Sequence, residues 1–526
     1  MRISKGQQVP VNIVGSSTFG RYPKISLEKT YNMFISDGWL INYAGFQKVS
    51  EILRRGEGRA LFHSVRGQFL IAVVSSSVYK LQANLAPQFI ANISTSSGEV
   101  FIDENLSSQI CIVDGQFAYI YNYAANSFTQ QTLTYLGNPI IPNYVCYHNT
   151  FFLIASAPNS INSQNWYAFQ FASTSTISLN TQFSLQTKPD SAIAVKRIPS
   201  RSNNVIVFGT TVAEVWTQTG GLQNYTRVSS FNIDSGCVSV ATIAASEEFV
   251  CWLGQNENNA PAIFVTDGAS IVRISDDGID YLLQTIVHPE DSTAFFFRRD
   301  GHLFYQITFF NVDDNLSLFY DFNTKKFFHL SDQNLNYHPA RQVVYFNENT
   351  YFISLNDASI YQMETEFVTY NYNLDPNIPG DVIPRIRICK SLCLDDSSRF
   401  RVWQFTFLLE QGVTDSYLMK PSGTVCNGTL ITEMGYPIIT EQDFLILSEN
   451  GQCVSIFDIP RVDMSFSKNG NQSFSNVVGV NLNPQGRYKN QIRFDRMGQA
   501  NEFTIQLRFW GIQRFVAKDG MAELML

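Results

Sequence analysis

The sequence is poor in several features that mark particular classes of protein. Lys, Arg, Asp and Glu make up only 16 % of the 526 residues, below the quarter or so that is usual for globular domains. No apolar run approaches the length of a transmembrane helix. Residues 1–15 begin with basic residues but contain no apolar segment, so we expect no secretory signal peptide. These absences argue against a secreted or membrane-spanning chain.

Cysteine and histidine are present, but their spacing matches neither a disulfide framework nor a metal site. The eight cysteines are scattered, which predicts reduced and mostly buried thiols. Cys389 and Cys393 lie four apart on an expected strand and should face the same side, but no second pair follows at the spacing of structural zinc. We therefore expect no metal and no cofactor. The histidines, none of them in an HxH or HExxH pair, are His63, His148, His288, His302, His329 and His338.

Motifs of catalysis are also missing. No nucleophile elbow, phosphate-binding loop or dinucleotide fingerprint occurs. The acidic pairs Asp313-Asp314 and Asp395-Asp396 have the residue type of glycosidase carboxylates, but solvated loop charge explains them more simply. Residues 467–474, SKNGNQSF, resemble a degraded sialidase Asp-box, a motif that fixes a hairpin turn and does not react. We expect no enzyme and no catalytic, cofactor-binding or metal-binding residues.

The charge balance argues against a protein that grips DNA. The chain has 37 basic and 45 acidic residues, a formal net charge of −8, and no basic run longer than two residues. Sequence-independent DNA binding needs Lys and Arg arrayed against phosphates. A surface along which DNA slides without being held is compatible with this composition.

The sequence is rich in aromatic residues and contains an internal repeat. Phe (42) and Tyr (24) are abundant and favour pleated sheets. An apolar run, a polar turn and a second aromatic run recur at intervals of 41, 41, 54, 44, 45 and 49 residues. Four-stranded propeller blades repeat every ~40–50 residues. Seven starts favour seven blades, with six as the alternative, and a set of unrelated antiparallel sheets is the competing interpretation. The starts are Phe69, Ile110, Phe151, Val205, Phe249, Ala294 and Val343.

The turns between the runs support hairpins. Asp114-Gly115, Asp267-Gly268, Asp300-Gly301 and Asn347-Glu348-Asn349 separate alternating strands, and such turns ask their central residues to tolerate positive φ. The stretch LSLFYDFNTKKFFHL, residues 316–330, is then the outer half of the sixth unit, with residues 294–310 as its inner half.

One segment reads as a helix. In residues 274–287 we place Ser275 as the N-cap, followed by two aspartates that suit a helix start. Ile279, Leu282, Leu283 and Ile286 then follow the helical i, i+3, i+4, i+7 spacing.

The sequence repeat ends after about residue 363. A segment with three prolines marks a linker, and longer alternating strands follow. In residues 502–510 Phe503, Ile505, Leu507 and Phe509 should point one way and the polar residues between them toward water. We expect an all-β chain with an N-terminal extension (1–50), a propeller (51–364), a linker (365–380) and a C-terminal β-sandwich or barrel (381–526).

The middle of the chain resembles a known family. Residues 205–221 (VIVFGTTVAEVWTQTGG), 225–240, 249–255 and 271–283 occur in the order and spacing of the packaged-DNA stabilisation protein, or tail hub, of short-tailed bacteriophages. Residues 31–49 and 487–510 are similar to that family's two ends. The matching residues include Phe208-Gly209, Glu214, Trp216, Gly236-Cys237 and Trp252-Leu253-Gly254. Glu214, Trp216 and Cys237 are interpreted as blade-packing residues.

The resemblance implies a structural role in the virion. The resemblance implies a tail hub of six subunits arranged in a ring, which is docked under the portal and its adaptor ring. The tail needle or nozzle would lie below this ring, and tailspikes or fibres would be attached at its side. They help to retain packaged DNA and form part of its exit channel. Synthesis in the host cytoplasm follows. The alternative hypothesis is a propeller that binds or hydrolyses glycans, which predicts carboxylates and aromatic residues clustered at the propeller axis.

Overall fold

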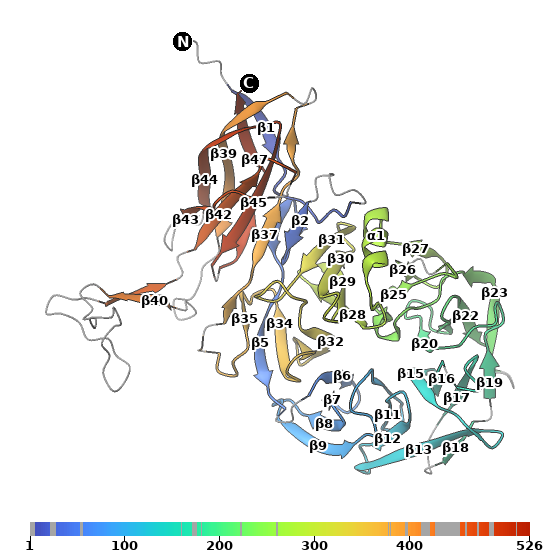
Figure 1. Cartoon of the computed structure of the whole chain (residues 1–526). Helices are drawn as coiled ribbons and strands as arrows, with labels where there is room; N and C mark the ends of the chain where they lie inside the picture. The colour runs from blue at the N-terminus through green and yellow to red at the C-terminus, as the bar shows by residue number, and fades with distance from the viewer. Residues whose placement is uncertain are drawn as a thin grey trace, which may run out of the picture.

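The computed structural model has two bodies, a ring of sheets and a β-sandwich that stands against one side of it (Figure 1). The residues that the structure describes are 6–20, 28–52, 56–158, 160–170, 176–179, 181–220, 224–258, 261–376, 378, 380–394, 398–411, 421–426, 453–457, 460–470, 473–482, 489–511 and 513–525.

The ring is a β-propeller, and its blades follow the order of the chain. Within the described residues, seven antiparallel units of four strands succeed one another. The first three units are β6 (Gly58–Ser64), β7 (Phe69–Val74), β8 (Ser77–Leu81) and β9 (Pro87–Asn92); β10 (Phe101–Glu104), β11 (Gln109–Val113), β12 (Ala118–Asn122) and β13 (Ser127–Tyr135); and β15 (Pro142–His148), β16 (Phe151–Ser156), β17 (Asn165–Phe169) and β19 (Thr181–Ser184). The short strands β14 (Asn138–Pro139) and β18 (Thr176–Ser178) extend β13.

The later units complete the ring. They are β20 (Ala194–Arg197), β21 (Asn204–Phe208), β22 (Ala213–Gln218) and β23 (Tyr225–Ile233); β24 (Ala244–Ala245), β25 (Val250–Gly254), β26 (Ala262–Thr266) and β27 (Ile271–Arg273); β28 (Ser292–Arg299), β29 (His302–Phe309), β30 (Leu316–Asp321) and β31 (Lys326–Leu330); and β32 (Ala340–Phe346), β33 (Asn349–Ser354), β34 (Ile360–Glu364) and β5 (Gly45–Ser50). The predicted propeller is confirmed, and residues 316–330 are the outer pair of their unit, as expected.

One unit is reduced, which bears on the number of blades. Six units begin with a strand of at least four residues, whereas β24 has two and is preceded by a single 3-10 turn, η1 (Val240–Thr242). The propeller therefore has six complete blades, and the number of blades is seven only if the reduced unit is also counted. The ring closes through β5, a strand from the N-terminal region that pairs with β34 as the fourth strand of the last unit.

The turns behave in two ways. Asp300 (φ 49°) and Gly301 (φ 79°) both adopt the left-handed conformation, as do Asn347 and Glu348, as the sequence predicts. Asp114 differs, because only Gly115 has a positive φ there. The carboxylate of Asp114 instead accepts hydrogen bonds from the backbone N–H groups of Gln116 and Phe117. The side chain closes this turn, which removes the need for a left-handed aspartate.

The predicted helix is present, but its cap lies one residue later than expected. Helix α1 (Asp277–Thr285) begins after Asp276, whose carboxylate accepts from the Ile279 N–H at 2.8 Å. The expected cap, Ser275, instead accepts a hydrogen bond from the Ile263 N–H. Asp276 prevails because a carboxylate both satisfies an unpaired N–H and interacts favourably with the helix dipole. No described helix is long and apolar enough to cross a membrane.

The C-terminal body is a β-sandwich, as predicted. One sheet has the order β1 (Gln7–Val11), β47 (Gly520–Met525), β39 (Phe400–Gln411), β46 (Phe515–Ala517), β4 (Trp39–Asn42) and β3 (Met33–Ser36), with β44 (Lys489–Ala500) beside β39. The facing strands are β37 (Arg385–Ile388), β45 (Glu502–Trp510), β42 (Arg461–Ser467) and β43 (Val478–Asn481), with β38 (Leu392–Cys393) beside β45. Phe405, Phe494, Phe503 and Leu507 fill the core between the sheets. The hairpin β40 (Pro421–Cys426) and β41 (Cys453–Phe457) stands apart in Figure 1.

One expectation about the sandwich is wrong. Thr504 and Gln506, predicted to face water, are 0 % and 7 % exposed. Thr504 shares a hydrogen bond with the Ser391 hydroxyl and Gln506 accepts one from Ser465. Polar side chains with partners of this kind can be buried at little cost, so alternation alone does not identify the wet face.

The two bodies share a sheet. Strand β2 (Lys29–Tyr31) pairs in parallel with β31 of the propeller and antiparallel with β37 of the sandwich. The linker region also adds β35 (Thr369–Asn371) beside β5, and β36 (Asp381–Val382) pairs with β35. The N-terminal region therefore contributes strands to both bodies. The domain boundaries drawn from the sequence stay predictions.

Candidate functional site: the propeller axis and the junction

The propeller axis is closed at one end by two buried arginines, Arg59 and Arg341, which we call the closed end. Each lies at a β-bulge near the start of a first strand, where the pairing register shifts. A bulge changes the direction of a side chain relative to a regular strand, and both arginines line a small cavity at the axis. All five N–H groups of Arg59 are satisfied, and their acceptors are the carbonyls of Ser75, Thr95, Ser97 and Gly98 and the Thr95 hydroxyl.

Arg341 completes the closure with an ion pair. Its guanidinium donates to the Gly58 carbonyl at 3.1 Å and to the Glu99 carboxylate at 2.6 Å. Glu57 lies 3.6 Å away. The arginine side chain is 3 % exposed, whereas Glu57 and Glu99 are 35 % and 27 % exposed. The cation is thus buried while its anions reach water.

A lysine lies farther along the axis. The ammonium of Lys196 contacts the Tyr144 hydroxyl at 3.2 Å. Asp103 lies on β10, the first strand of its unit, next to the β15 strand of Tyr144. Its carboxylate accepts from the Tyr147 N–H at 2.7 Å, and burial raises the pKa of this carboxyl. The narrow space between the closed end and this lysine is about 100 Å³, room for about three waters at ~30 Å³ each.

The other end of the axis widens into a cavity of about 780 Å³, the axial cavity. Lys196, Arg197 and Arg298 line it together with Glu247. Apolar side chains complete its wall, and these are Phe62, Ile102, Phe296, Leu303 and Val343. Phe62 and Phe296 are half-buried. The wall is thus about equally apolar and polar, and a concave site that combines apolar surface with convergent polar groups is typical of binding sites.

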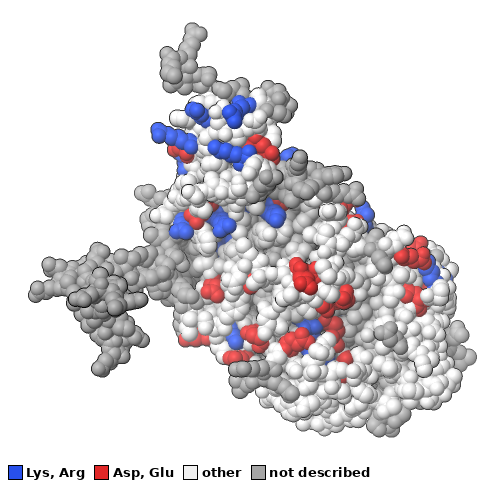
Figure 2. Space-filling view, in the orientation of Figure 1, with Lys and Arg blue, Asp and Glu red and all other residues white. Residues whose placement is uncertain are grey.

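The loops on the side of the closed end are acidic. The turns between second and third strands and the connections between units share one face of the propeller. Asp234, Glu257, Glu290 and Asp313 lie in these loops and are 77 %, 64 %, 63 % and 61 % exposed. Figure 2 shows Asp and Glu gathered over the propeller, whereas Lys and Arg predominate on the sandwich.

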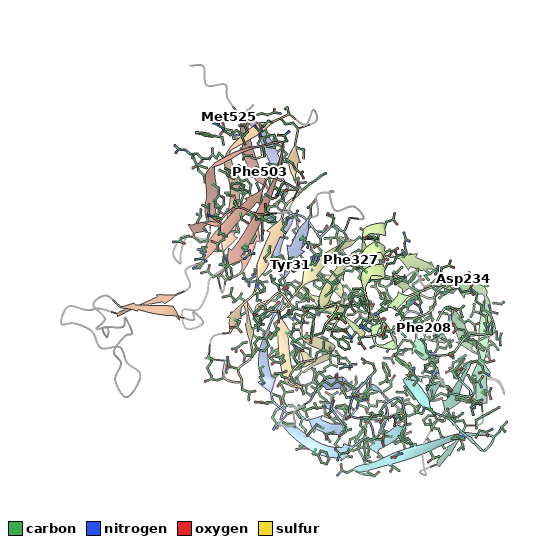
Figure 3. The ribbon with its side chains drawn as sticks, viewed as in Figure 1. Tyr31, Phe208, Asp234, Phe327, Phe503 and Met525 are labelled. Atoms are coloured by element: carbon green, nitrogen blue, oxygen red, sulfur yellow. The ribbon has the colours of Figure 1, made fainter. Side chains whose placement is uncertain are left out.

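The junction between the bodies is centred on β2. Arg387 of β37 is 0 % exposed, and its guanidinium pairs with the Glu28 carboxylate. It also donates to the carbonyls of Asn12 and Ser16 and to the Thr30 hydroxyl. Gly15 is required here, because a Cβ would lie 2.0 Å from the arginine nitrogen. Tyr31 and Phe327 mark this place in Figure 3.

Asn32 and His329 hold the same junction from the propeller side. The Asn32 amide donates to the Ser331 hydroxyl and the Pro384 carbonyl at 2.9 and 2.8 Å. The His329 ring stacks on Tyr31, with centroids 4.6 Å apart, and its Nδ1 lies 2.7 Å from the Ser17 hydroxyl. Burial lowers the pKa of His329 to about 3. Three segments far apart in sequence therefore meet in one buried polar network.

The residues singled out by the family resemblance are structural. Glu214 is 0 % exposed, and its carboxylate accepts from the Gln186 and Thr187 N–H groups and from the Trp216 indole. Cys237 is buried in the same core cluster as Trp216, and burial raises the pKa of its thiol to about 12. Nothing brings these three side chains to the axis.

The acidic and cysteine pairs do not form sites among the described residues. Asp314 accepts from the Val287 and His288 N–H groups, so it fixes a loop, whereas Asp313 is exposed; Asp395 and Asp396 lie outside the described residues. Cys389 is buried and Cys393 exposed, so the expectation that both face one side is wrong. The six cysteines whose side chains are described are free thiols.

In the part of the chain that the structure describes, no group of three or more His, Cys, Asp or Glu side chains is arranged to hold a metal ion. In the Asp-box-like segment, Asn469 accepts from the Ser467 hydroxyl at 2.9 Å and from the Ser473 N–H at 3.1 Å. The segment fixes a turn, as expected of that motif. Asn471 lies outside the described residues.

Sequence reasoning missed the arginines of the closed end and of the junction. Alternation predicts which strand residues face a core, but it contains no signal for a bulge, and Arg59 and Arg341 depend on one. Arg387 had a weak signal, since RIRI places arginine on one side of a strand. Its partners at residues 12–30 cannot be read from the sequence.

Comparison with known proteins gives one family. Residues 17–368 match the family described as "Bacteriophage P22 Gp10, beta-propeller". The match begins in the N-terminal segment that reaches the junction and ends just after β34, so it contains the whole ring. No curated protein sequence matches the chain.

Solved structures resemble the chain only distantly. They include a streptogramin B lyase (10 % identity, 62 % of this chain and 99 % of that chain, TM-score 0.37). The WD40 propeller of Doa1 is similar at 9 % identity (61 % and 97 %, TM-score 0.38). The Pan2 WD40 domain of Neurospora crassa has 8 % identity (59 % and 89 %, TM-score 0.37). Likenesses this weak carry no argument about function.

Proposed function

The chain belongs to the phage stabilisation family of bacteriophage P22 Gp10, and from this premise we propose that it is the tail hub of a short-tailed phage. The family match supports a structural, DNA-stabilising role in a phage. The hub would join the portal and its adaptor ring to the tail needle or nozzle and to tailspikes or fibres. Six copies would form a ring in the virion, after synthesis in the host cytoplasm.

The closed end supports a DNA path outside each propeller. Arg59 and Arg341 narrow the axis, and the space that they line is about 100 Å³, too small for a nucleic acid strand. DNA would therefore pass through the centre of the ring of subunits. The acidic loops on the side of the closed end would suit that lining, because like charge repels phosphates and lets DNA slide without being held.

The junction supports a role in bearing load. Strand β2 is hydrogen-bonded to both bodies, and Arg387 joins it to the N-terminal segment. A hinge between domains normally lies in exposed loop residues that make few contacts across the boundary. A shared sheet with a buried ion pair resists such movement, so force applied to one body would reach the other.

The proposal includes no catalysis. It draws support from the structural roles of Glu214 and Asp314, whose carboxylates hold loops, and from the family. Of the predicted signs of a glycan hydrolase, aromatic residues do line the axial cavity, but its two carboxylates are Asp103, held by the Tyr147 N–H, and Glu247, near Arg298.

Assembly with the adaptor tests the proposed function. The full chain is mixed with the portal-adaptor ring of the phage that encodes it, and the mass of the product is measured by light scattering or native mass spectrometry. We expect six copies to join each ring. A chain that stays monomeric beside an intact adaptor, and that binds or cleaves oligosaccharides instead, would overturn the proposal.

A further inference from the structure

The axial cavity collects positive charge in an acidic propeller. Between residues 51 and 364 Asp and Glu outnumber Lys and Arg by 26 to 16. Yet Lys196 and Arg197 of β20 and Arg298 of β28 all line one cavity. Glu247 also lines it, but its side chain is 85 % exposed and 3.9 Å from Arg298. The cavity therefore gathers positive charge on a propeller whose own net charge is negative.

The carboxylate nearest to Lys196 in the wall, Asp103, offsets only part of this positive charge. Asp103 is shared between the cavity and the narrow part of the axis, and burial raises the pKa of its carboxyl. Its oxygens are already engaged by the Tyr147 and Glu104 N–H groups. Within the described part of the chain, the hydrogen-bond partner of the Lys196 ammonium is the neutral Tyr144 hydroxyl. Three cations therefore face two carboxylates in the cavity wall, which leaves net positive charge there.

The wall favours a peptide over a small inorganic ion. Phe62, Phe296 and Val343 give it apolar surface, and about 780 Å³ falls in the range of sites that enclose a whole organic ligand. Among the described strands, β20 and β28 pair only on their outer sides, with β21 and β29. Their inner edges thus offer backbone groups of the kind that extended peptides use when they add to a sheet.

We propose that the axial cavity binds an extended acidic peptide segment. Its carboxylates would pair with Arg197, Arg298 and Lys196, and its apolar side chains would contact Phe62 and Phe296. Guanidinium groups form paired hydrogen bonds with carboxylates, so the two arginines should contribute most of the affinity for the peptide. Such binding does not require the hub function, since the site lies within one propeller.

The test uses the full chain and two labelled pentapeptides of opposite charge. Fluorescence anisotropy at 50 mM salt compares Glu-Val-Glu-Val-Glu with Lys-Val-Lys-Val-Lys. We expect the acidic peptide to bind at least about tenfold more tightly, although the protein itself is acidic, and its affinity to fall when salt is raised, as charge pairing requires.

The decisive comparison is between two charge reversals on the same face. The double variant Arg197→Glu/Arg298→Glu should lose at least about tenfold in affinity for the acidic peptide. Arg201→Glu is the matched control, because this exposed arginine follows β20 and bonds the Asp267 carbonyl but does not line the cavity. Urea midpoints show that all variants remain folded. Arg197 is exposed and Arg298 is 54 % exposed, so neither change should unfold the chain.

Three outcomes would overturn the proposal. One is no binding of the acidic peptide at millimolar concentration. Another is binding that the double variant and Arg201→Glu weaken equally. The third is binding of N-acetylneuraminic acid that depends on Arg197 and Arg298 while the peptide does not bind, which would assign the cavity to an acidic sugar.

Discussion

The closed end of the axis and the junction both bury arginine, but they join very different stretches of chain. Arg59 bonds backbone within about 40 residues along the sequence, as far as Gly98. Arg341 reaches Gly58 and Glu99, which are 283 and 242 positions away in sequence but lie in the adjacent first blade of the ring and in the loop that follows it. Arg387 bonds residues more than 350 positions away, including Asn12 and Ser16. The closed end therefore joins neighbouring blades, whereas the junction joins the first strands of the chain to the sandwich.

The two places also differ in how much water reaches their carboxylates. Glu99 and Glu57 beside Arg341 are 27 % and 35 % exposed, while Glu28 beside Arg387 is 17 % exposed. The less an anion is exposed, the less well water can solvate it when its cation is removed. Removing the buried arginine of the junction should therefore destabilise the protein more than removing Arg341 from the closed end.

The largest expected effect is that of Arg387→Met. The change leaves Glu28 and the Asn12 and Ser16 carbonyls without their donor, and breaking a buried pair in this way costs about 3–5 kcal/mol. The first unfolding transition in urea, followed by circular dichroism, measures the loss. Arg401→Met, at an exposed position on β39, should change stability by less than about 0.5 kcal/mol. A loss below about 1 kcal/mol for Arg387→Met would contradict the expectation that the junction contributes more to stability than the closed end.

Acidification should be nearly as damaging, through two histidines. His329 lies in the junction, and His338 precedes the strand that holds Arg341; burial lowers the pKa of each to about 3. The unfolded pKa is ~6.5, so the unfolded chain binds more protons below that pH. Stability is complete above ~6.5 and falls as pH decreases toward about 3, by ~2 kcal/mol per histidine at pH 5.

Unfolding in urea at pH 7.5 and pH 5 measures this dependence. His329→Gln should reduce the difference between the two pH values by about 2 kcal/mol, because its contribution is lost. The remainder stays, since burial also lowers the pKa of His338, His63 and His148. Equal stability of the wild-type chain at both pH values would contradict the burial of neutral histidines on which the junction depends.

Much of the fold could be predicted because local chemistry and global architecture agree. The evenly spaced starts from Phe69 to Val343 indicate repeated sheets, and the Asp300-Gly301 turn has the predicted conformation. The strand alternation in residues 502–510 found the sandwich core at Phe503 and Leu507. The turn and the alternation depend on neighbours within about ten residues, and the repeat recurs along the chain without needing contacts between its units. Local preferences of this kind agree with the final fold.

What could not be predicted depends on contacts between distant segments. β5 closes the ring by pairing with β34, which lies more than 300 residues later in the sequence. The periodicity of the sequence gives no indication of that pairing. The bulges at Arg59 and Arg341 change side-chain direction by a single irregular residue. Even the local helix cap shifted from Ser275 to Asp276, since the Ser275 hydroxyl accepts from Ile263 instead.

The closed end can be tested with Arg341→Met. Glu99 loses its partner but reaches water, so we expect a loss of about 1–3 kcal/mol, less than for Arg387→Met. Urea unfolding measures it, with Arg298→Met as the control, because Arg298 is 54 % exposed. A loss equal to or greater than that of Arg387→Met would reverse the order of the two places and make the closed end the stronger joint.

The smallest effect should come from Ser17→Ala in the junction. The Ser17 hydroxyl accepts from the Thr30 N–H at 3.0 Å and lies 2.7 Å from His329 Nδ1, and loss of such a partner costs about 1 kcal/mol. Ser200→Ala, in an exposed loop, is the control. If the junction is one network, Ser17→Ala and His329→Gln together should cost less than the sum of the two single changes, whereas Ser17→Ala and Arg341→Met should add. Additivity of both pairs would mean that Ser17 and His329 are neighbours without being coupled.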